Sequence, residues 1–406
     1  MKNKTAVKAQ PRRWFAFSKA NVPEKKSAPL AGFAALQTVG QAQTTPAVYP
    51  AMAAQGYAKN PVVYRCVRMI CEAAASVPWI GYEGADECET HPGLDIIERP
   101  NTSQSRQEFL EAIICNMLLS GNAFIEHAEP VPGKRRLFVL RADHVSVESD
   151  DDNWPTGISM RRGSKKRSLS FGDAASVGHA LHLKFYDPLD DLYGQSPLEA
   201  ALAALDVHNA AGLWNKSLLD NAARPSGALI YAPPDNSTLT PEQYETLKQE
   251  LDEGFSGARN AGRPLLLEGG LHWKAMGLTP SDMDFVATKD NASREIALAF
   301  GVPPMLLGIP GDNTYANYQE AQRAFYRLTV LPLLRRIVSA FTRWLMPING
   351  SAFRFDIDID QIEGLSLERE SLWKRVDTAS FLTRAEKRQA VGYSPTPQDE
   401  EDDRHA

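Results

Sequence analysis

The chain has 406 residues, of which 43% are hydrophobic and 23% charged, and this ordinary globular composition excludes a chain that is disordered throughout. Its formal net charge of −6 argues against a protein that grips nucleic acid over its whole surface, because such proteins are usually basic. No run of about eighteen apolar residues occurs, so no membrane-spanning helix is expected.

Charge is concentrated at the two ends of the chain. Residues 1–26 hold eight Lys or Arg and one acidic residue, whereas residues 399–403 are all acidic. Residues 1–59 lack sustained periodicity and are rich in Ala, Gln, Thr and Pro, which predicts a flexible N-terminal arm. The Arg12-Arg13 pair faintly resembles an export signal, but the apolar stretch after it is short and interrupted, so a basic arm is the favoured interpretation.

The cysteines are Cys66, Cys71, Cys88 and Cys115. Their spacings match neither a zinc site nor a disulfide framework, so we expect free thiols. Cys66 and Cys71 fall in an apolar helical pattern and should be buried.

Ordered structure is expected from Asn60 onward. Asn60-Pro61 is a typical helix start, because Asn caps free backbone N–H groups and Pro fits the first turn. The helix should end before Pro78. Its apolar face consists of Val63, Val67, Ile70 and Ala74. The elements expected next are a short helix within 92–100, a helix that begins at Ser103 or Ser105 and ends at Gly121, and a strand at 123–127.

Between residues 137 and 185 the apolar period changes to two. The strand candidates are 137–140, 145–148, 158–161, 167–171 and 180–184. Residues 162–166 are typical of a hairpin tip. We expect a mostly antiparallel sheet beside the helices.

A long helix is predicted from Ser196 to Arg224, which would measure about 40 Å at 1.5 Å per residue. Its first residues suggest a capping box, in which the Ser196 hydroxyl accepts from the Glu199 amide and the Glu199 carboxylate accepts from the Ser196 amide.

A compact β-α-β piece follows. The pattern predicts a strand at 227–232, a helix opened by a capping box at 240–243, and strands at 264–268 and 272–276.

Two more long helices are predicted, from Ser281 to Gly301 and over 317–345. Pro332 lies inside the second of them, where a missing N–H donor predicts a kink near 328–332. The last elements expected are a strand at 353–359, buried through Phe355, Ile357 and Ile359, and helices at 367–375 and 384–390.

Motifs of catalysis are lacking. No G-x-S-x-G elbow and no phosphate-binding G-x-x-x-x-G-K-[ST] run occurs, so neither a catalytic residue nor a cofactor is expected. The acidic groups that could hold a cation are Asp187, Asp190 and Asp191, and the alternating Asp356, Asp358 and Asp360. A solvated turn and an outward strand face are the favoured interpretations, so no metal site is expected.

Five segments carry a family resemblance through their order. They are Leu118–Phe124, Tyr193–Leu198, Pro225–Gly227, Ile296–Gly308 and Asn313–Asn317, the last followed by a helix with Pro332. Over about residues 60–390 the chain resembles the HK97-type phage portal family, which includes portals of gene transfer agent particles. The resemblance implies an α+β portal fold with a wing, a helical stem, a β-α-β clip and a helical crown.

The resemblance also implies a division of the chain. Its parts would be the arm 1–59, the wing 60–195, a stem helix 196–224, the clip 225–280, a second stem helix 281–307, a tunnel loop 308–318, a kinked helix and wing strand 319–364, the crown 365–397 and an acidic tail 398–406. Such subunits form a dodecameric ring at one capsid vertex of a virion or virus-like particle, which is assembled in the host cytoplasm. Double-stranded DNA passes through the ring.

The expected sites follow from this division. The narrowest part of the channel would be formed by Gly311, Asp312, Asn313, Thr314 and Tyr315, whose single charge suits sliding DNA. The clip would face the terminase large subunit and a head–tail adaptor through Glu250, Glu253, Arg259, Asn260 and Arg263. The major capsid protein would be a further partner, and we expect a channel wall of net negative charge.

The sequence is also compatible with two other functions. One is a capsid adaptor or scaffold that does not conduct DNA. The other is a metal-dependent nuclease that uses Asp356, Asp358 and Asp360. The basic hairpin at 161–167 could contact scaffold, capsid or DNA, or be a solvated tip.

Overall fold

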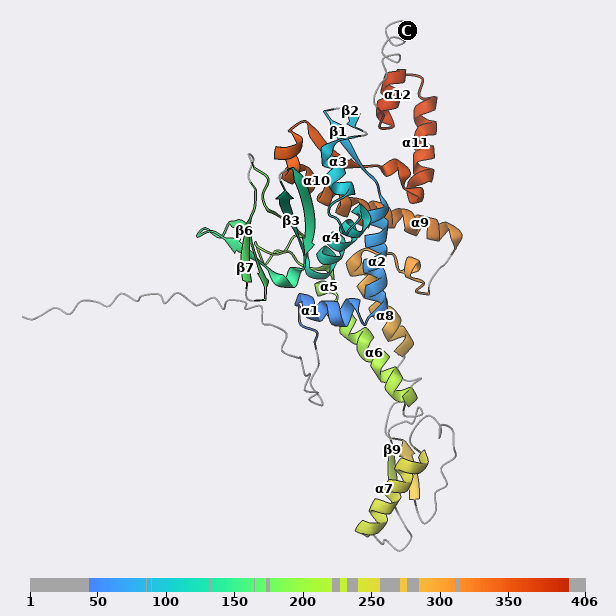
Figure 1. Cartoon of the computed structure of the whole chain (residues 1–406). Helices are drawn as coiled ribbons and strands as arrows, with labels where there is room; N and C mark the ends of the chain where they lie inside the picture. The colour runs from blue at the N-terminus through green and yellow to red at the C-terminus, as the bar shows by residue number, and fades with distance from the viewer. Residues whose placement is uncertain are drawn as a thin grey trace, which may run out of the picture. The chain divides into compact units, whose positions relative to one another are not determined.

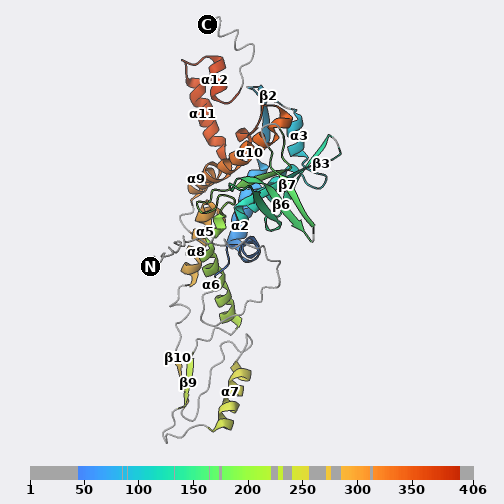
Figure 2. The same ribbon diagram turned by 90° about the vertical axis from the view of Figure 1, so that its left-hand side faces the viewer.

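The structure is a computed structural model. It describes residues 44–84, 86–88, 90–131, 133–163, 165–172, 176–220, 227–231, 240–255, 271–275, 285–310 and 314–393. Helices and small antiparallel sheets both occur in these residues (Figures 1 and 2), which confirms the expected α+β class.

The longer helical elements are α1 (Tyr49–Ala51) with the π-helical η1 (Met52–Tyr57), α2 (Pro61–Ser76), α3 (Pro92–Glu98), α4 (Arg106–Ser120), α5 (Pro197–Ala200), α6 (Leu202–Asp220), α7 (Pro241–Phe255), α8 (Phe285–Phe300), α9 (Tyr315–Phe325), the π-helical η5 (Tyr326–Val330), α10 (Leu331–Asn349), α11 (Ser366–Thr378) and α12 (Arg384–Ala390). Short 3₁₀ turns are η2 (Ala142–His144), η4 (Pro304–Leu307), η6 (Ile359–Gln361) and η7 (Glu363–Leu365).

The strands form separate antiparallel sheets. Their bounds are β1 (Trp79–Glu83), β2 (Asp86–Cys88), β3 (Asn122–Val131), β4 (Lys134–Leu140), β5 (Val145–Ser149), β6 (Pro155–Arg162), β7 (Lys165–Ser170), β8 (Ala180–Lys184), β9 (Gly227–Tyr231), β10 (Leu271–Ala275) and β11 (Phe353–Ile357). Their orders are β11-β1-β2, β4-β3-β8, β5-β6-β7 and β10-β9. The five strands predicted between residues 137 and 185 are confirmed, as is their antiparallel pairing.

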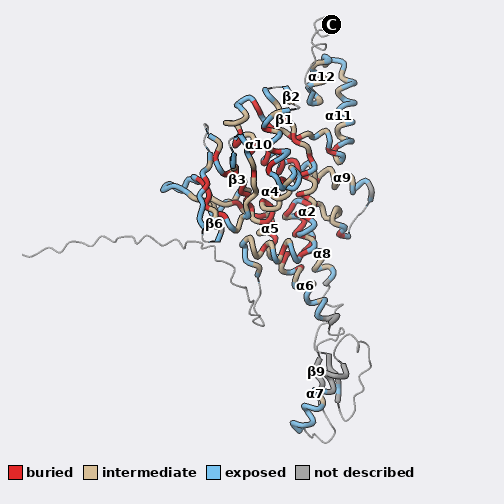
Figure 3. The backbone as a smooth tube through the Cα atoms, in the orientation of Figure 1, coloured by how far each residue is buried: buried red, intermediate tan, exposed pale blue. Residues whose placement is uncertain are grey.

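The main core lies between α2, α4 and α10. Asn60 caps α2 as predicted, because its Oδ1 accepts from the amides of Val62 and Val63 at 3.0 and 3.1 Å. The predicted face of α2 is fully buried against α4 (Figure 3). Cys66 and Cys71 lie on it as buried free thiols, and burial raises the pKa of Cys66 to about 12.

The expectation of an irregular arm up to residue 59 is wrong for its last part. Residues 49–57 are helical, and Met52 and Gly56 are buried, with Gly56 packed against Leu198. A stretch rich in Ala and Gln with few large apolar residues gave no clear period, although tertiary packing buries one side of it. Residues 1–43 lie outside the described part of the chain.

The strand near the C-terminus pairs with a strand that was not predicted. β11 runs beside β1, with Trp79 opposite Ile357, and buries Phe353, Phe355 and Ile357. The burial predicted for Ile359 is wrong, because the strand ends before it and Ile359 is 36% exposed in η6.

The structure describes the segment predicted as the clip, 225–280, only in part. β9 pairs with β10, and α7 opens with the predicted capping box, in which Gln243 Oε1 accepts from the Thr240 amide at 3.0 Å and Thr240 Oγ1 accepts from the Gln243 amide at 3.3 Å. The strand predicted at 264–268 lies outside the described residues.

Candidate functional site

Two of the segments that carry the family resemblance meet in a buried junction. Asn122 accepts from the Gly194 amide at 2.8 Å, and its side-chain amide donates to the Gly194 carbonyl at 3.0 Å. Gly121 has a positive φ of 74°, and a Cβ on it would lie 2.2 Å from the Gly194 oxygen. These segments therefore form a structural joint between β3 and α5, in which only glycine fits at position 121.

Ser196 belongs to this joint and is the predicted N-cap, but the predicted capping box is wrong, because the Glu199 amide donates to the Ser196 backbone carbonyl and not to its hydroxyl. The Ser196 hydroxyl donates to the Leu118 carbonyl at 2.8 Å and accepts from the Leu198 amide at 3.0 Å. The helix is also not continuous from Ser196 to Arg224, because Ala201, with φ −102° and ψ 11°, separates α5 from α6. Residues 221–226 lie outside the described part.

The helices α6 and α8, which fall in the segments predicted as the stem, pack against each other through small and branched apolar side chains. Leu205, Ala292 and Ile296 are buried in this region. Hydrogen bonds hold α6 in place at His208 and Asn209. The Asn60 side-chain amide contacts His208 Nδ1 and donates to Asn209 Oδ1, both at 2.9 Å. Burial, followed by the nearby Lys289, lowers the pKa of His208.

Other faces of these helices carry exposed apolar side chains. Val207 on α6 is 45% exposed, whereas Val286 and Leu298 on α8 are 72% and 79% exposed. Leucine and valine at this exposure leave apolar surface in water.

The loop after α8 is held at both ends. On its α8 side, Arg294 Nη2 donates to the Pro310 carbonyl at 2.6 Å. On its α9 side, Thr314 Oγ1 accepts from the Asn317 amide at 3.2 Å, so Thr314 caps α9 and is exposed. Tyr315 begins α9. Of the predicted tunnel residues, Gly311, Asp312 and Asn313 lie outside the described part of the chain.

The helix irregularity predicted at Pro332 takes the form of a π-helical turn. η5 ends two residues before Pro332, and the backbone stays helical into the first turn of α10, so the wider turn accommodates the N–H that proline lacks. Thr329 Oγ1 donates to the Gly301 carbonyl at 2.5 Å, which ties this turn to the end of α8. A second proline, Pro347, lies inside α10 and was not predicted to be helical.

Of the predicted clip residues, Glu250 and Glu253 lie on α7, whereas Arg259, Asn260 and Arg263 fall outside the described residues. The sequence of α7 contains five acidic residues and one basic residue, Lys248. This helix is therefore suited to a basic partner surface.

The acidic groups considered as metal ligands have other roles. Asp358 accepts from the Asp360 amide at 3.0 Å, Asp360 forms an ion pair with Arg369 at 2.5 Å, and Asp356 pairs with Arg354 at 2.8 Å. Asp187 and Asp190 accept from nearby backbone amides in turns. The described residues contain no group of three or more His, Cys, Asp or Glu side chains placed to hold a metal ion. None of the described helices combines the length and apolarity needed to cross a bilayer.

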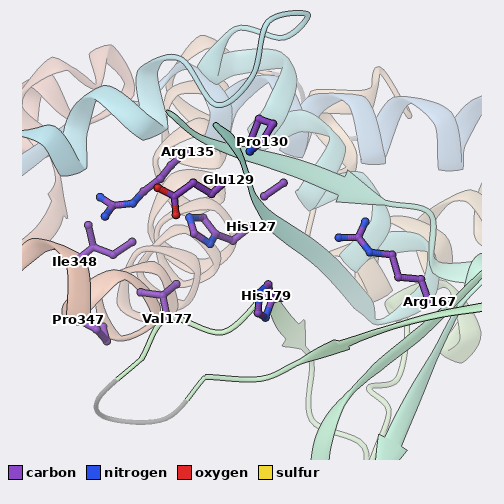
Figure 4. Close-up of a pocket in the computed structure, with 10 residues that line it drawn as sticks. His127, Glu129, Pro130, Arg135, Arg167, Val177, His179, Pro347 and Ile348 are labelled. Atoms are coloured by element: carbon purple, nitrogen blue, oxygen red, sulfur yellow. The ribbon is translucent and has the colours of Figure 1, made fainter. Parts of the chain in front are cut away.

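One polar pocket was not predicted. It measures about 560 Å³ and is lined by residues from β3, β4, β7, the segment before β8 and the end of α10, among them His127, Glu129, Arg135, Arg167 and His179 (Figure 4). Burial, and then Arg135, lowers the pKa of His127. The basic run Lys134-Arg135-Arg136 is visible in the sequence. Its position across the pocket from Arg167 depends on how the two sheets fold together.

Comparison with known proteins agrees with this architecture. The family model for phage portal proteins matches residues 61–392. The probable portal protein of Streptomyces phage phiC31 is 26% identical and covers 87% of this chain and 80% of its own length. An uncharacterized protein of Rickettsia bellii is 41% identical, covering 83% of this chain and 87% of its own.

A solved structure described as the neck of a native GTA particle, computed with C12 symmetry, contains a chain 50% identical to this one. Its TM-score is 0.67, and the match covers 88% of this chain and 96% of that one. Because the family model spans most of the sequence, the assignment does not depend on a single segment, and the chain belongs to the phage portal protein family.

Proposed function

We propose that this chain is the portal subunit of a virion or virus-like particle and assembles into a dodecameric ring at one capsid vertex. The observation that carries the proposal is the match of the family model over residues 61–392, joined to a 50% identical chain in a particle neck solved with C12 symmetry. Portal proteins are structural, so no reaction is assigned. The higher identity to the GTA neck than to phiC31 favours a gene transfer agent type of particle.

Ring assembly explains the exposed apolar residues of the stem. A cyclic ring with more than two subunits needs two different surfaces on each subunit, one for each neighbour. α6 offers Val207, and α8 offers Val286 and Leu298, on helices that pack on each other only through their buried sides. Neighbouring copies would cover these side chains.

In this ring the loop between η4 and α9 would face the DNA. The Arg294–Pro310 bond and the Thr314 cap fix where the loop begins and ends, whereas the segment 311–315 carries a single charged residue, Asp312. A loop with few charges suits transport, since each phosphate contact with Lys or Arg adds strong, salt-dependent affinity that would hold the DNA.

The clip would provide the docking site for the terminase large subunit during packaging and for the head–tail adaptor afterwards. Glu250 and Glu253 belong to the acidic helix α7, and Arg259, Asn260 and Arg263 follow it in the sequence. The wing would contact the major capsid protein.

Electron microscopy of the purified protein tests the ring. We expect a ring with a central opening wider than the roughly 20 Å diameter of a DNA duplex, whose grooves set that scale. A closed or linear assembly would favour a scaffold that does not conduct DNA.

Particles with residues 311–314 deleted test the loop. We expect them to assemble a vertex but to retain less nuclease-protected DNA, whereas deletion of the exposed loop residues 151–153 should leave DNA content unchanged. Normal packaging by the first variant would contradict the role given to the loop.

A further inference from the structure

The β6–β7 hairpin concentrates positive charge near its tip, where Glu148 and Glu126 pair only with Lys166 and Arg167. Its register places Arg161 opposite Lys166 and Arg162 opposite Lys165. Like charges directly opposite each other destabilise an antiparallel pair. Lys166 forms an ion pair with Glu148 at 3.1 Å, but Arg161 and Lys165 are exposed, and their side chains form no ion pair or hydrogen bond within the described chain.

The β3–β4 hairpin carries a second basic run. Lys134, Arg135 and Arg136 begin β4, and the first two are exposed. Glu129 lies across the hairpin, but one of its carboxylate oxygens already accepts from the Gly133 amide at 2.6 Å. Across the described residues, Lys134, Arg135 and Arg136 form no side-chain hydrogen bond or ion pair, so their charge is available to another molecule.

The pocket joins the two hairpins into one surface. Arg135 of β4 and Arg167 of β7 line opposite sides of it, with His127 and His179 between them (Figure 4). His127 is only 9% exposed, and its Nε2 has no hydrogen-bond partner within the described residues. A buried polar atom without a partner costs free energy, which indicates that an additional group completes this site.

We propose that these two hairpins and the pocket between them bind the phosphate backbone of double-stranded DNA outside the channel. The composition of the surface favours DNA over a protein. Protein interfaces have an apolar, aromatic-rich centre in which Lys is depleted, whereas nucleic-acid interfaces are strongly positive. The tips present Lys134, Arg135, Arg161 and Lys165, without an aromatic residue among the described positions 161–167.

This surface explains how an acidic protein could hold DNA locally. The chain has a net charge of −6, but cations gather on two neighbouring hairpins, where several phosphates can be contacted at once. Such contacts are independent of base sequence and weaken steeply as salt rises. The proposal rests on the portal function proposed above and gives the wing a role separate from the channel.

A closed DNA minicircle tests the proposal, because a closed circle cannot thread a preassembled ring. Rings of the wild-type protein should bind a fluorescent minicircle, with an affinity that falls as salt rises. The triple variant Arg135→Gln, Arg161→Gln and Lys165→Gln should bind at least about tenfold more weakly at low salt. Its log–log salt slope should be smaller by about two to three, near 0.9 for each lost phosphate contact.

The matched control removes three positive charges elsewhere, in Lys59→Gln, Lys374→Gln and Lys387→Gln, and should bind like the wild type. Acetylation of Lys134 and Lys165 in wild-type rings gives a reading that needs no variant, since bound minicircle should protect both lysines. Rings that form normally but bind no minicircle would overturn this inference and leave the portal assignment intact. Failure to form rings would overturn both.

An acidic protein partner predicts a different result. The triple variant would then bind the minicircle as well as the wild type but would fail to enter capsids. That combination would also overturn the proposal.

Discussion

At Gly121, a single side-chain atom would disrupt the joint between β3 and α5. Gly121→Ala must adopt a positive φ, which costs about 1–2 kcal/mol for a residue with a Cβ, and its methyl group would meet the Gly194 carbonyl 2.2 Å away. We expect the free energy of unfolding to fall by about 2–5 kcal/mol, since crowding of a packed site adds about 1–3 kcal/mol. Chemical denaturation measures this change.

Gly84→Ala is the matched control for this substitution. Gly84 also has a positive φ, 66°, but a Cβ there would have no heavy atom within 4 Å. For Gly84→Ala the free energy of unfolding should fall only by the cost of the positive φ, about 1–2 kcal/mol. Equal losses at both glycines would show that the contact with Gly194 is unimportant.

His182 predicts an acid sensitivity of the same joint. Burial, and then Lys184, lowers its pKa from 6.5 to about 3, and its Nε2 lies 2.9 Å from Asn122 Oδ1. Between these two pKa values the unfolded chain binds a proton that the folded chain excludes, so stability falls as the pH falls below 6.5. The loss approaches about 1.4 kcal/mol per pH unit.

Denaturation of wild type and His182→Gln at several pH values between 4.5 and 7.5 measures this dependence. The variant should lose less stability on acidification, although it is less stable at neutral pH because the His182–Phe124 stack is lost. Identical slopes for the two proteins would contradict the assignment.

Among the elements, α8 gives the sharpest test of ring assembly. Leu298 is 79% exposed, and the proposed ring covers it with a neighbouring copy. Leu298→Asp should leave the subunit folded but weaken assembly by tenfold or more, since burying an unpaired charge costs several kcal/mol. Mass photometry measures the distribution between subunit and ring.

Leu189→Asp is the control for assembly, because Leu189 is 92% exposed on the loop between β8 and α5. It should assemble like the wild type. Normal rings formed by Leu298→Asp would show that this part of α8 lies outside the subunit contact.

The elements differ in how well the sequence predicts them, and the reasons are local. α2 and α7 were predicted correctly at their first residues, because Asn60 and Thr240 form the side-chain caps that their residue types favour. Ser196 also caps its helix, but its hydroxyl accepts from the Leu198 amide and not from the Glu199 amide, so the reciprocal capping box was predicted wrongly. β1 was missed because its partner, β11, lies more than two hundred and fifty residues later in the chain.

At the scale of the whole molecule, the candidate sites also differ in how well the sequence predicts them. The loop before α9 could be placed from sequence because neighbouring residues form it, between a Pro-Pro stop and a Thr cap. The pocket could not be placed, since Arg135, Arg167 and His179 come from separate strands and loops and meet only in the folded sheets. Which faces of α6 and α8 stay exposed likewise depends on how the two helices pack.

The hydrogen bonds at His208 and Asn209 determine where α6 can bend. His208 and Asn209 contact the cap of α2, and Asn209 also donates to the Gln55 carbonyl at 3.0 Å, so two separate segments fasten one turn. Gly212 lies just beyond that turn, in the weakest helix-forming residue type apart from proline, with open space where a Cβ would be. We therefore expect α6 to bend most easily at Gly212, beyond the turn that these hydrogen bonds hold.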